Sequence, residues 1–159
     1  MTDTNIWTPF NFFVGSWRGA GKGKPGISRV ERTYTFALNG KFLFAQSKST
    51  YEPQEKNPKG EVHEDWGLIS YDSSKKTHVL RQFHVEGFVN QYVLELLEAE
   101  SQTYRFVTEA IENIPPGWKA RETYQILSPD EFIEVFELAA PGNEFELYSE
   151  SRLQRIREG

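Results

Sequence analysis

The sequence predicts an all-β protein, a single closed up-and-down antiparallel barrel of about ten strands with a short N-terminal helix capping one end. Hydrophobic residues recur with a period of two along most of the 159 residues, which is the periodicity of β-strands. Turn-forming residues separate the periodic stretches at regular intervals. The strands are expected to be of similar length with no crossover connection, which favours a barrel over a sandwich because closure removes both sheet edges.

The first element expected along the chain is a helix of one or two turns over residues 8–14. Thr8 can serve as its N-cap, Pro9 suits the first helical position and Gly15 ends it. Its apolar side chains would share one side and plug an end of the barrel: Phe10, Phe13 and Val14.

Strands are expected over residues 15–24, 28–37, 41–51, 63–72, 77–85, 88–97, 102–111, 118–127, 131–140 and 145–155. Asn39-Gly40 supplies the positive φ angles of a tight hairpin. The one long connection, residues 52–61, is rich in proline and charge and is expected to be a mobile loop. Strands of the same character continue on both sides of it, so residues 1–159 are expected to form one domain.

Composition excludes several classes of function. The net charge is −5 and the basic residues are scattered, which argues against nucleic acid and against an anionic membrane surface. The absence of cysteine excludes disulfides, thiolate metal sites and cysteine nucleophiles. The N-terminus has no signal-peptide pattern, and no apolar run reaches the length of a membrane span. We therefore expect a cytoplasmic protein without membrane insertion.

Residues 12–19, Phe-Phe-Val-Gly-Ser-Trp-Arg-Gly, resemble the opening of the calycin superfamily, which includes the lipocalins and the fatty-acid-binding proteins. These barrels begin with a short helix and a Gly-x-Trp motif. The resemblance implies that an arginine late in the last strand packs across Trp17, with Arg155 as the first candidate and Arg152 as the second. A guanidinium over an indole ring contributes about 0.5–2 kcal/mol.

The resemblance is nearest to bacterial fatty-acid-binding-protein-like barrels of unknown function and is looser to the nitrobindin-like haem barrels. Segments 38–43 and 66–72 are also similar to these families. Nitrobindin-type barrels hold haem through a histidine near the last strand, whereas the histidines here are His63, His78 and His84. Haem is therefore disfavoured and no cofactor is expected, although Tyr148 could act as an atypical ligand.

The resemblance implies that a small hydrophobic molecule is bound inside the barrel, with arginine and tyrosine holding any carboxylate. In strand 77–85, Val79, Arg81 and Phe83 share one face while Gln82 and His84 share the other, and either face could line the cavity. Aromatic rings recur on successive strands, as they do in small-molecule cavities. The residues expected to line the cavity or its mouth are Trp66, Arg81, Phe83, His84, Tyr92, Tyr104 and Arg121.

Other polar patterns are expected to have no catalytic role. His63 and Asp65 can converge on one strand face, but two ligands do not make a dedicated metal site, so a solvated strand edge is expected. Glu131, Glu134 and Glu137 fit the usual solvent-facing pattern. The glycines of residues 19–23 are expected to let the first strand bend, because the segment lacks the ending of a phosphate loop.

The function expected from the sequence is binding or carriage of a small hydrophobic ligand, with or without a carboxylate. One alternative is an enzyme of the isomerase or cyclase type that acts on a bound apolar substrate. Another is a haem barrel with an atypical ligand. The sequence leaves the oligomeric state open, a homodimer included.

Overall fold

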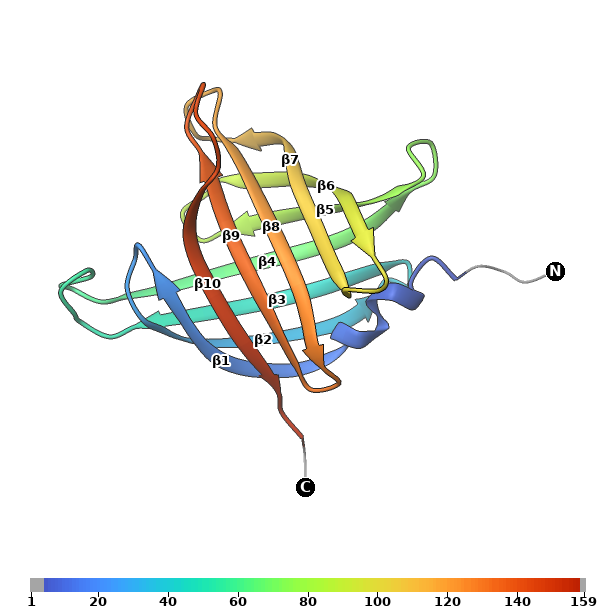
Figure 1. The fold of residues 1–159 in the computed structure, drawn as a ribbon, viewed down its shortest axis with the longest axis horizontal. Helices are drawn as coiled ribbons and strands as arrows, with labels where there is room; N and C mark the ends of the chain where they lie inside the picture. Colours follow the sequence, from blue (N-terminus) through green and yellow to red (C-terminus); the bar gives the residue numbers. More distant parts are fainter. Residues whose placement is uncertain (1–4, 158–159) are drawn as a thin grey trace.

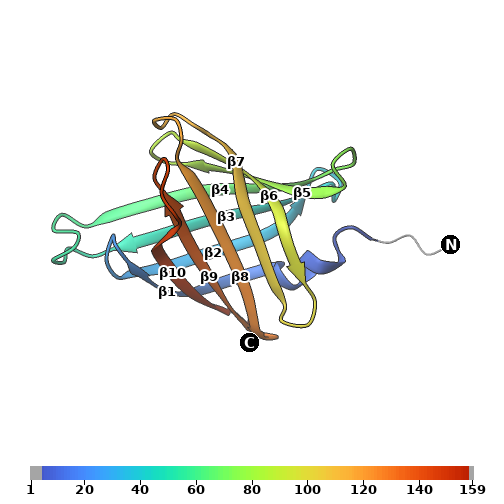
Figure 2. The ribbon, with the colours of Figure 1, turned by 45° about the horizontal axis from the view of Figure 1, so that its top comes forward.

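The structure is a computed structural model that describes residues 5–157. Ten antiparallel strands close into one barrel in the order β1-β10-β9-β8-β7-β6-β5-β4-β3-β2 (Figures 1 and 2). Their bounds are β1 Gly15–Gly23, β2 Ser28–Ala37, β3 Phe42–Tyr51, β4 Glu61–Asp72, β5 Thr77–His84, β6 Val89–Glu98, β7 Thr103–Glu112, β8 Lys119–Ser128, β9 Glu131–Ala139 and β10 Glu146–Arg155. The predicted all-β barrel is confirmed.

The N-terminal helix is a 3₁₀-helix, η1 (Thr8–Phe13), which lies against one end of the barrel (Figure 1). Its N-cap is Trp7 and not Thr8, and the Trp7 amide donates instead to the side chain of Asn5. Phe10 and Phe13 are buried in the barrel end as expected. Val14 is not part of this plug, because it is extended and exposed as the chain turns into β1.

The two ends of the chain are joined at the plug. Trp17 of β1 is fully buried, donates its indole N–H to the Phe13 carbonyl at 2.8 Å, and lies opposite Arg155 of β10 in the strand register. The Arg155 guanidinium carbon lies 4.4 Å from the centre of the Trp17 ring. The same guanidinium donates to the carbonyls of Phe12 and Val14 at 2.7 and 2.9 Å. One side chain therefore ties η1, β1 and β10 together.

The close approach of β1 to β10 depends on glycine. A Cβ atom added at Gly19 would lie 1.8 Å from the backbone oxygen of Arg152, so no larger residue fits without moving a strand. This agrees with the expectation that the glycines of the first strand let it follow the curve of the barrel.

The connection between β3 and β4 is bonded to the neighbouring β1–β2 turn. Gln54 accepts from the amide of Ile27 and donates to its carbonyl, both at 2.8 Å. Asn57 donates to the carbonyl of Pro25 at 3.2 Å. Within residues 5–157, no helix is long and apolar enough to cross a membrane.

Replacing Arg155 with lysine tests the closure of the barrel. Lysine keeps the charge but cannot lie flat on the Trp17 indole while it donates to several carbonyls. We expect the free energy of unfolding to fall by about 2–4 kcal/mol, measured by chemical denaturation monitored by circular dichroism.

Arg152→Lys is the matched control, because Arg152 belongs to the same strand and pairs with Glu131 on the surface. An exposed ion pair of this kind contributes about 0–1 kcal/mol, so the control is expected to change stability little. Equal losses in the two variants would show that Arg155 does not have the closing role assigned to it.

Candidate functional site

A cavity of about 620 Å³ occupies the end of the barrel opposite η1. One wall is polar and comes mainly from the inward faces of β2–β5. The apolar wall is formed by Ile111, Trp118, Phe136 and Leu138, and Phe88 extends the apolar lining beside His84. Toward the plug the interior narrows to a space of about 30 Å³, room for roughly one water molecule.

The floor between the cavity and the plug is a buried polar network. Arg32 of β2 donates to Glu134 of β9 at 2.7 Å and to the hydroxyl of Ser47 at 3.1 Å. Tyr124 of β8 donates to Glu122 of the same strand at 2.6 Å, and the carboxyls of Glu122 and Glu134 are in hydrogen-bonding contact. Arg32, Glu122 and Glu134 all line the cavity.

The two carboxyl groups of the floor have opposite protonation tendencies. Burial opposes the charge of Glu134, but the adjacent Arg32 guanidinium outweighs it and holds the pKa of Glu134 at about 2. Burial and the neighbouring Glu134 carboxylate raise the pKa of Glu122 well above its ordinary value. Glu134 is therefore the anion of the pair, and Glu122 is the member that keeps a proton.

Two histidines and two carboxylates meet on the polar wall. His63 Nδ1 lies 2.8 Å from Glu86 Oε2, and its Nε2 lies 3.5 Å from Asp65 Oδ2 and 3.3 Å from His84 Nδ1. The hydrogen bond to Asp65 is the main cause that raises the pKa of His63 to about 9, against the opposing effect of burial and with a further contribution from Glu86. Burial lowers the pKa of His84, whose ring stacks on Phe88.

Three buried polar atoms of the cavity wall have no hydrogen-bond partner within residues 5–157: Gln82 Oε1, His84 Nε2 and Asn90 Oδ1. Gln82 and Asn90 lie opposite each other in the register of β5 and β6. A buried polar group without a hydrogen-bond partner costs about 1–3 kcal/mol, so these atoms have hydrogen-bonding capacity left for an occupant of the cavity.

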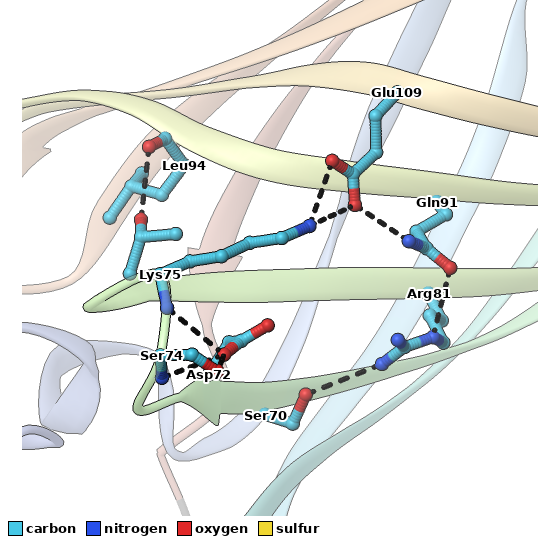
Figure 3. A network of polar contacts seen from close by, with 9 residues as sticks. Ser70, Asp72, Ser74, Lys75, Arg81, Gln91, Leu94 and Glu109 are labelled. Carbon is cyan, nitrogen blue, oxygen red and sulfur yellow. Dashed lines mark hydrogen bonds and ion pairs between the residues drawn. The ribbon is translucent and has the colours of Figure 1, made fainter.

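Four of the residues predicted to line the cavity lie on the outer face of the barrel instead. Trp66 and Phe83 are 56% and 43% exposed, and Trp66 packs edge to face against Phe44. Arg81 belongs to an outer network in which it donates to Ser70 and Gln91 (Figure 3). Arg121 pairs with Glu137, with both contacts at 2.9 Å.

The four residues were predicted to line the cavity because the sequence does not reveal which face of a strand is inside the barrel. Alternation divides a strand into two faces but does not say which face is inside, and on β5 the inward face is the polar one with Gln82 and His84. Val79, which is buried, and Phe83, which is exposed, lie on the other face of β5 and are as apolar as a core face, so the pattern made that face resemble an interior.

The remaining three predicted residues lie inside the barrel but not together. His84 lines the large cavity. Tyr104 lines the narrow space and donates to the Pro9 carbonyl of η1. Tyr92 is fully buried, and its hydroxyl accepts from Asn90 at 2.9 Å.

Two polar expectations require correction. His63 and Asp65 are not on a solvated strand edge, because they line the cavity and His84 joins them from the next strand. Glu134 is not solvent-facing, because it is buried against Arg32, whereas Glu131 and Glu137 do pair with arginines near the surface. Sequence analysis also missed Arg32, Glu122 and Asn90, which have no distinguishing motif.

The turn between Asp72 and Thr77 is the sequence signal that could have predicted that His84 lies next to Asp65. Antiparallel pairing extended from that turn places Asp65 opposite His84, as the structure has it.

Tyr148, considered from the sequence as an atypical haem ligand, lines the cavity, and burial together with the nearby carboxylates of Glu61 and Glu86 raises the pKa of its hydroxyl. His78 is at the plug end, bonded to the Ile6 carbonyl at 2.9 Å.

Comparison with solved structures shows the fold. The chain is similar to Rv2717c from M. tuberculosis, with 17% identity and a TM-score of 0.73 over 98% of this chain and 100% of that one. It is also similar to the S-type phycobiliprotein lyase CPES from Guillardia theta, with 14% identity and a TM-score of 0.56 over 94% and 92% of the two chains. The chain shares their antiparallel barrel. No family model and no curated protein matches the sequence.

Replacing Glu122 with glutamine tests the protonated carboxyl of the floor. A raised folded-state pKa means that folded Glu122 holds its proton while the unfolded chain loses it above about pH 4.3, so stability falls as pH rises toward the folded pKa. The slope contributed by this one group is at most about 1.4 kcal/mol per pH unit. The Glu122→Gln variant should lose this decline.

Denaturation midpoints measured from pH 4 to pH 9 for both proteins check the prediction. Glu137→Gln, at a carboxylate on the outer face of the barrel, is the control and should keep the decline. A Glu122→Gln protein with the same pH slope as the wild type would contradict the assigned protonation of Glu122.

Proposed function

We propose that the barrel binds a small amphipathic molecule in the cavity opposite η1. The observation that carries the proposal is the cavity itself, because about 620 Å³ lies within the range of about 300–1,000 Å³ that is usual for small-molecule sites. Its apolar wall, with Trp118 and Phe136, suits a hydrophobic body. Its polar wall presents two buried acceptors, Gln82 Oε1 and Asn90 Oδ1, that an occupant would satisfy.

The charge of the cavity indicates the polar end of that molecule. Arg81 and Arg121, the arginines expected to hold a carboxylate, lie outside the barrel, and Arg32 is already paired with Glu134. Five carboxyl groups line the cavity, of which Glu122 keeps its proton, and the cationic side chains of the lining are Arg32, Lys22 and His63. We therefore propose a neutral or cationic ligand with hydrogen-bond donors in place of a carboxylate.

The protonated Glu122 supports a second candidate function. A buried carboxylic acid with a raised pKa, beside an ionised partner and facing a cavity, is the arrangement used for general acid–base catalysis. An isomerase or cyclase that protonates a bound substrate through Glu122 would use this geometry.

Filling the cavity tests the binding proposal. Ser49 of β3 lines the cavity, so a Ser49→Phe ring would occupy the space beside His63, its neighbour in the register. We expect binding of Nile red, a neutral apolar probe measured by its fluorescence, to weaken about 10–100-fold, as a packing cost of about 1–3 kcal/mol implies.

Lys48→Phe is the matched control, because the same ring is added one residue away on the exposed face of the same strand. It should bind Nile red as the wild type does. Equal affinity in all three proteins would place the probe outside the cavity and contradict the proposed site.

Native mass spectrometry of the purified chain separates the two candidate functions. A co-purified adduct lost in Ser49→Phe supports binding. If Glu122 is a catalytic acid, an adduct held by Glu122→Gln should change in mass or retention time when its extract is incubated with the wild type. An extract that stays unchanged excludes catalysis on that molecule and leaves carriage as the function.

A further inference from the structure

We propose that His63, Asp65 and His84 form a binding site for one divalent transition-metal ion on the polar wall of the cavity. This proposal does not depend on the amphipathic ligand, because a metal ion can be bound with the rest of the cavity empty of organic molecules. It rests on the spacing of the ligand atoms, on the strand register and on the second bond made by His63.

The ligand atoms have the spacing of a coordination shell. His63 Nε2, Asp65 Oδ2 and His84 Nδ1 lie within 4.8 Å of one another, and His63 Nε2 is 3.5 and 3.3 Å from the other two. Metal–ligand bonds of about 2.0–2.2 Å put neighbouring ligands about 3.0–3.5 Å apart in octahedral or tetrahedral geometry. An ion can therefore be accommodated with little movement of these side chains.

The register of β4 and β5 fixes this arrangement. Asp65 and His84 are directly opposite each other in the antiparallel ladder, and His63 is two residues from Asp65 on the same inward face. Two adjacent strands thus supply all three ligands, which is more rigid than a site built on loops.

Glu86 is not one of the three proposed ligands but forms a hydrogen bond with one of them, His63. The Glu86 carboxylate lies 2.8 Å from His63 Nδ1, and Nε2 faces Asp65 and His84, so an ion bound there would replace the proton of Nε2. Metal-bound histidines usually donate their other ring N–H to a carboxylate in this way, and the loss of that partner lowers metal affinity about 10–100-fold. A hydrogen bond of this kind sets the tautomer that the site needs.

The donor set indicates the class of metal. Two imidazoles and one carboxylate suit zinc, iron, cobalt or nickel, whereas magnesium and calcium prefer oxygen ligands alone. Three protein ligands leave coordination positions open toward the cavity, as in catalytic metal sites. Beside them Gln82 is 8% exposed and its Oε1 has no partner within residues 5–157, which independently marks this wall as one that faces a polar occupant.

A second group of possible ligands, Glu61, His63 and Glu86, lies nearby. It would use Nδ1 of His63 and only one imidazole, and Glu61 is an exposed residue at the start of β4. The two groups differ in the residues they need, so variants distinguish them: His84 and Asp65 belong to the proposed site, and Glu61 belongs to the other.

Isothermal titration calorimetry of the full chain with zinc chloride, after treatment with a chelator, tests the proposal. We expect one ion per chain. His84→Gln and Asp65→Asn should weaken binding at least about tenfold, and Glu86→Gln about 10–100-fold. Glu64→Gln, on the outward face of β4, is the control and should bind as the wild type does.

Absorption of the cobalt(II) form gives a second readout, because nitrogen ligands shift its visible bands and His84→Gln should alter them. Circular dichroism of each variant checks that it is folded. The proposal is overturned if zinc does not bind the folded wild type. It is overturned equally if His84→Gln binds zinc unchanged, or if Glu61→Gln weakens binding while Asp65→Asn does not.

Discussion

Arg155 stacked on Trp17 is the contact on which the rest of the structure depends. It joins the last strand to the first, and its guanidinium also holds the carbonyls of Phe12 and Val14, so η1 is fixed across one end of the barrel. Phe10 and Phe13 then fill that end together with Tyr104 and Phe132. Because the apolar contacts gather there, the opposite end is left with fewer side chains than a barrel of ten strands can enclose. The cavity is thus a consequence of where the barrel is sealed.

Closure of the barrel at the η1 end also explains the charge states of Arg32, Glu134 and Glu122 between the cavity and the plug. Arg32 and Glu134 lie where water is largely excluded, and a buried ion pair persists there only when its remaining polar atoms are also bonded. Ser47 and Tyr34 bond the guanidinium, and Glu122 contacts the carboxylate. The positive charge of Arg32 is balanced by the negative charge of Glu134, so the second carboxyl group, that of Glu122, keeps its proton. Burial, together with the adjacent Glu134 carboxylate that Arg32 keeps ionised, therefore raises the pKa of Glu122.

Sequence periodicity predicted the fold well because strand alternation, turn residues and the Gly-x-Trp opening all depend on local pattern. The site was harder to predict because it depends on which face of each strand is inside. On β5 the apolar residues Val79 and Phe83 point outward, whereas Gln82 and His84 point into the cavity. The inward face of β5 changes along the strand, from Leu80 in the core to Gln82 and His84 at the cavity, so the rule that the apolar face is the inner one fails only at the cavity. His84 was predicted, but its partner Asp65 required the register set by a turn several residues away.

Shifts in the pairing register occur in some strand pairs of the barrel and not in those that carry the polar wall. Within residues 5–157, the breaks in pairing register lie in the pairs β6–β7, β8–β9 and β9–β10. The pairs from β2 to β5, which carry the polar wall, run without a break. A bulge moves side chains by altering twist and direction, and the strands of the bulged pairs carry Ile111, Phe136 and Leu138 of the apolar lining as well as the polar residues Glu122 and Glu134. Hydrogen bonds require fixed directions, and an unbroken ladder holds the contacts of His63 with Asp65 and His84 in place. The two walls thus differ in backbone geometry as well as in chemistry.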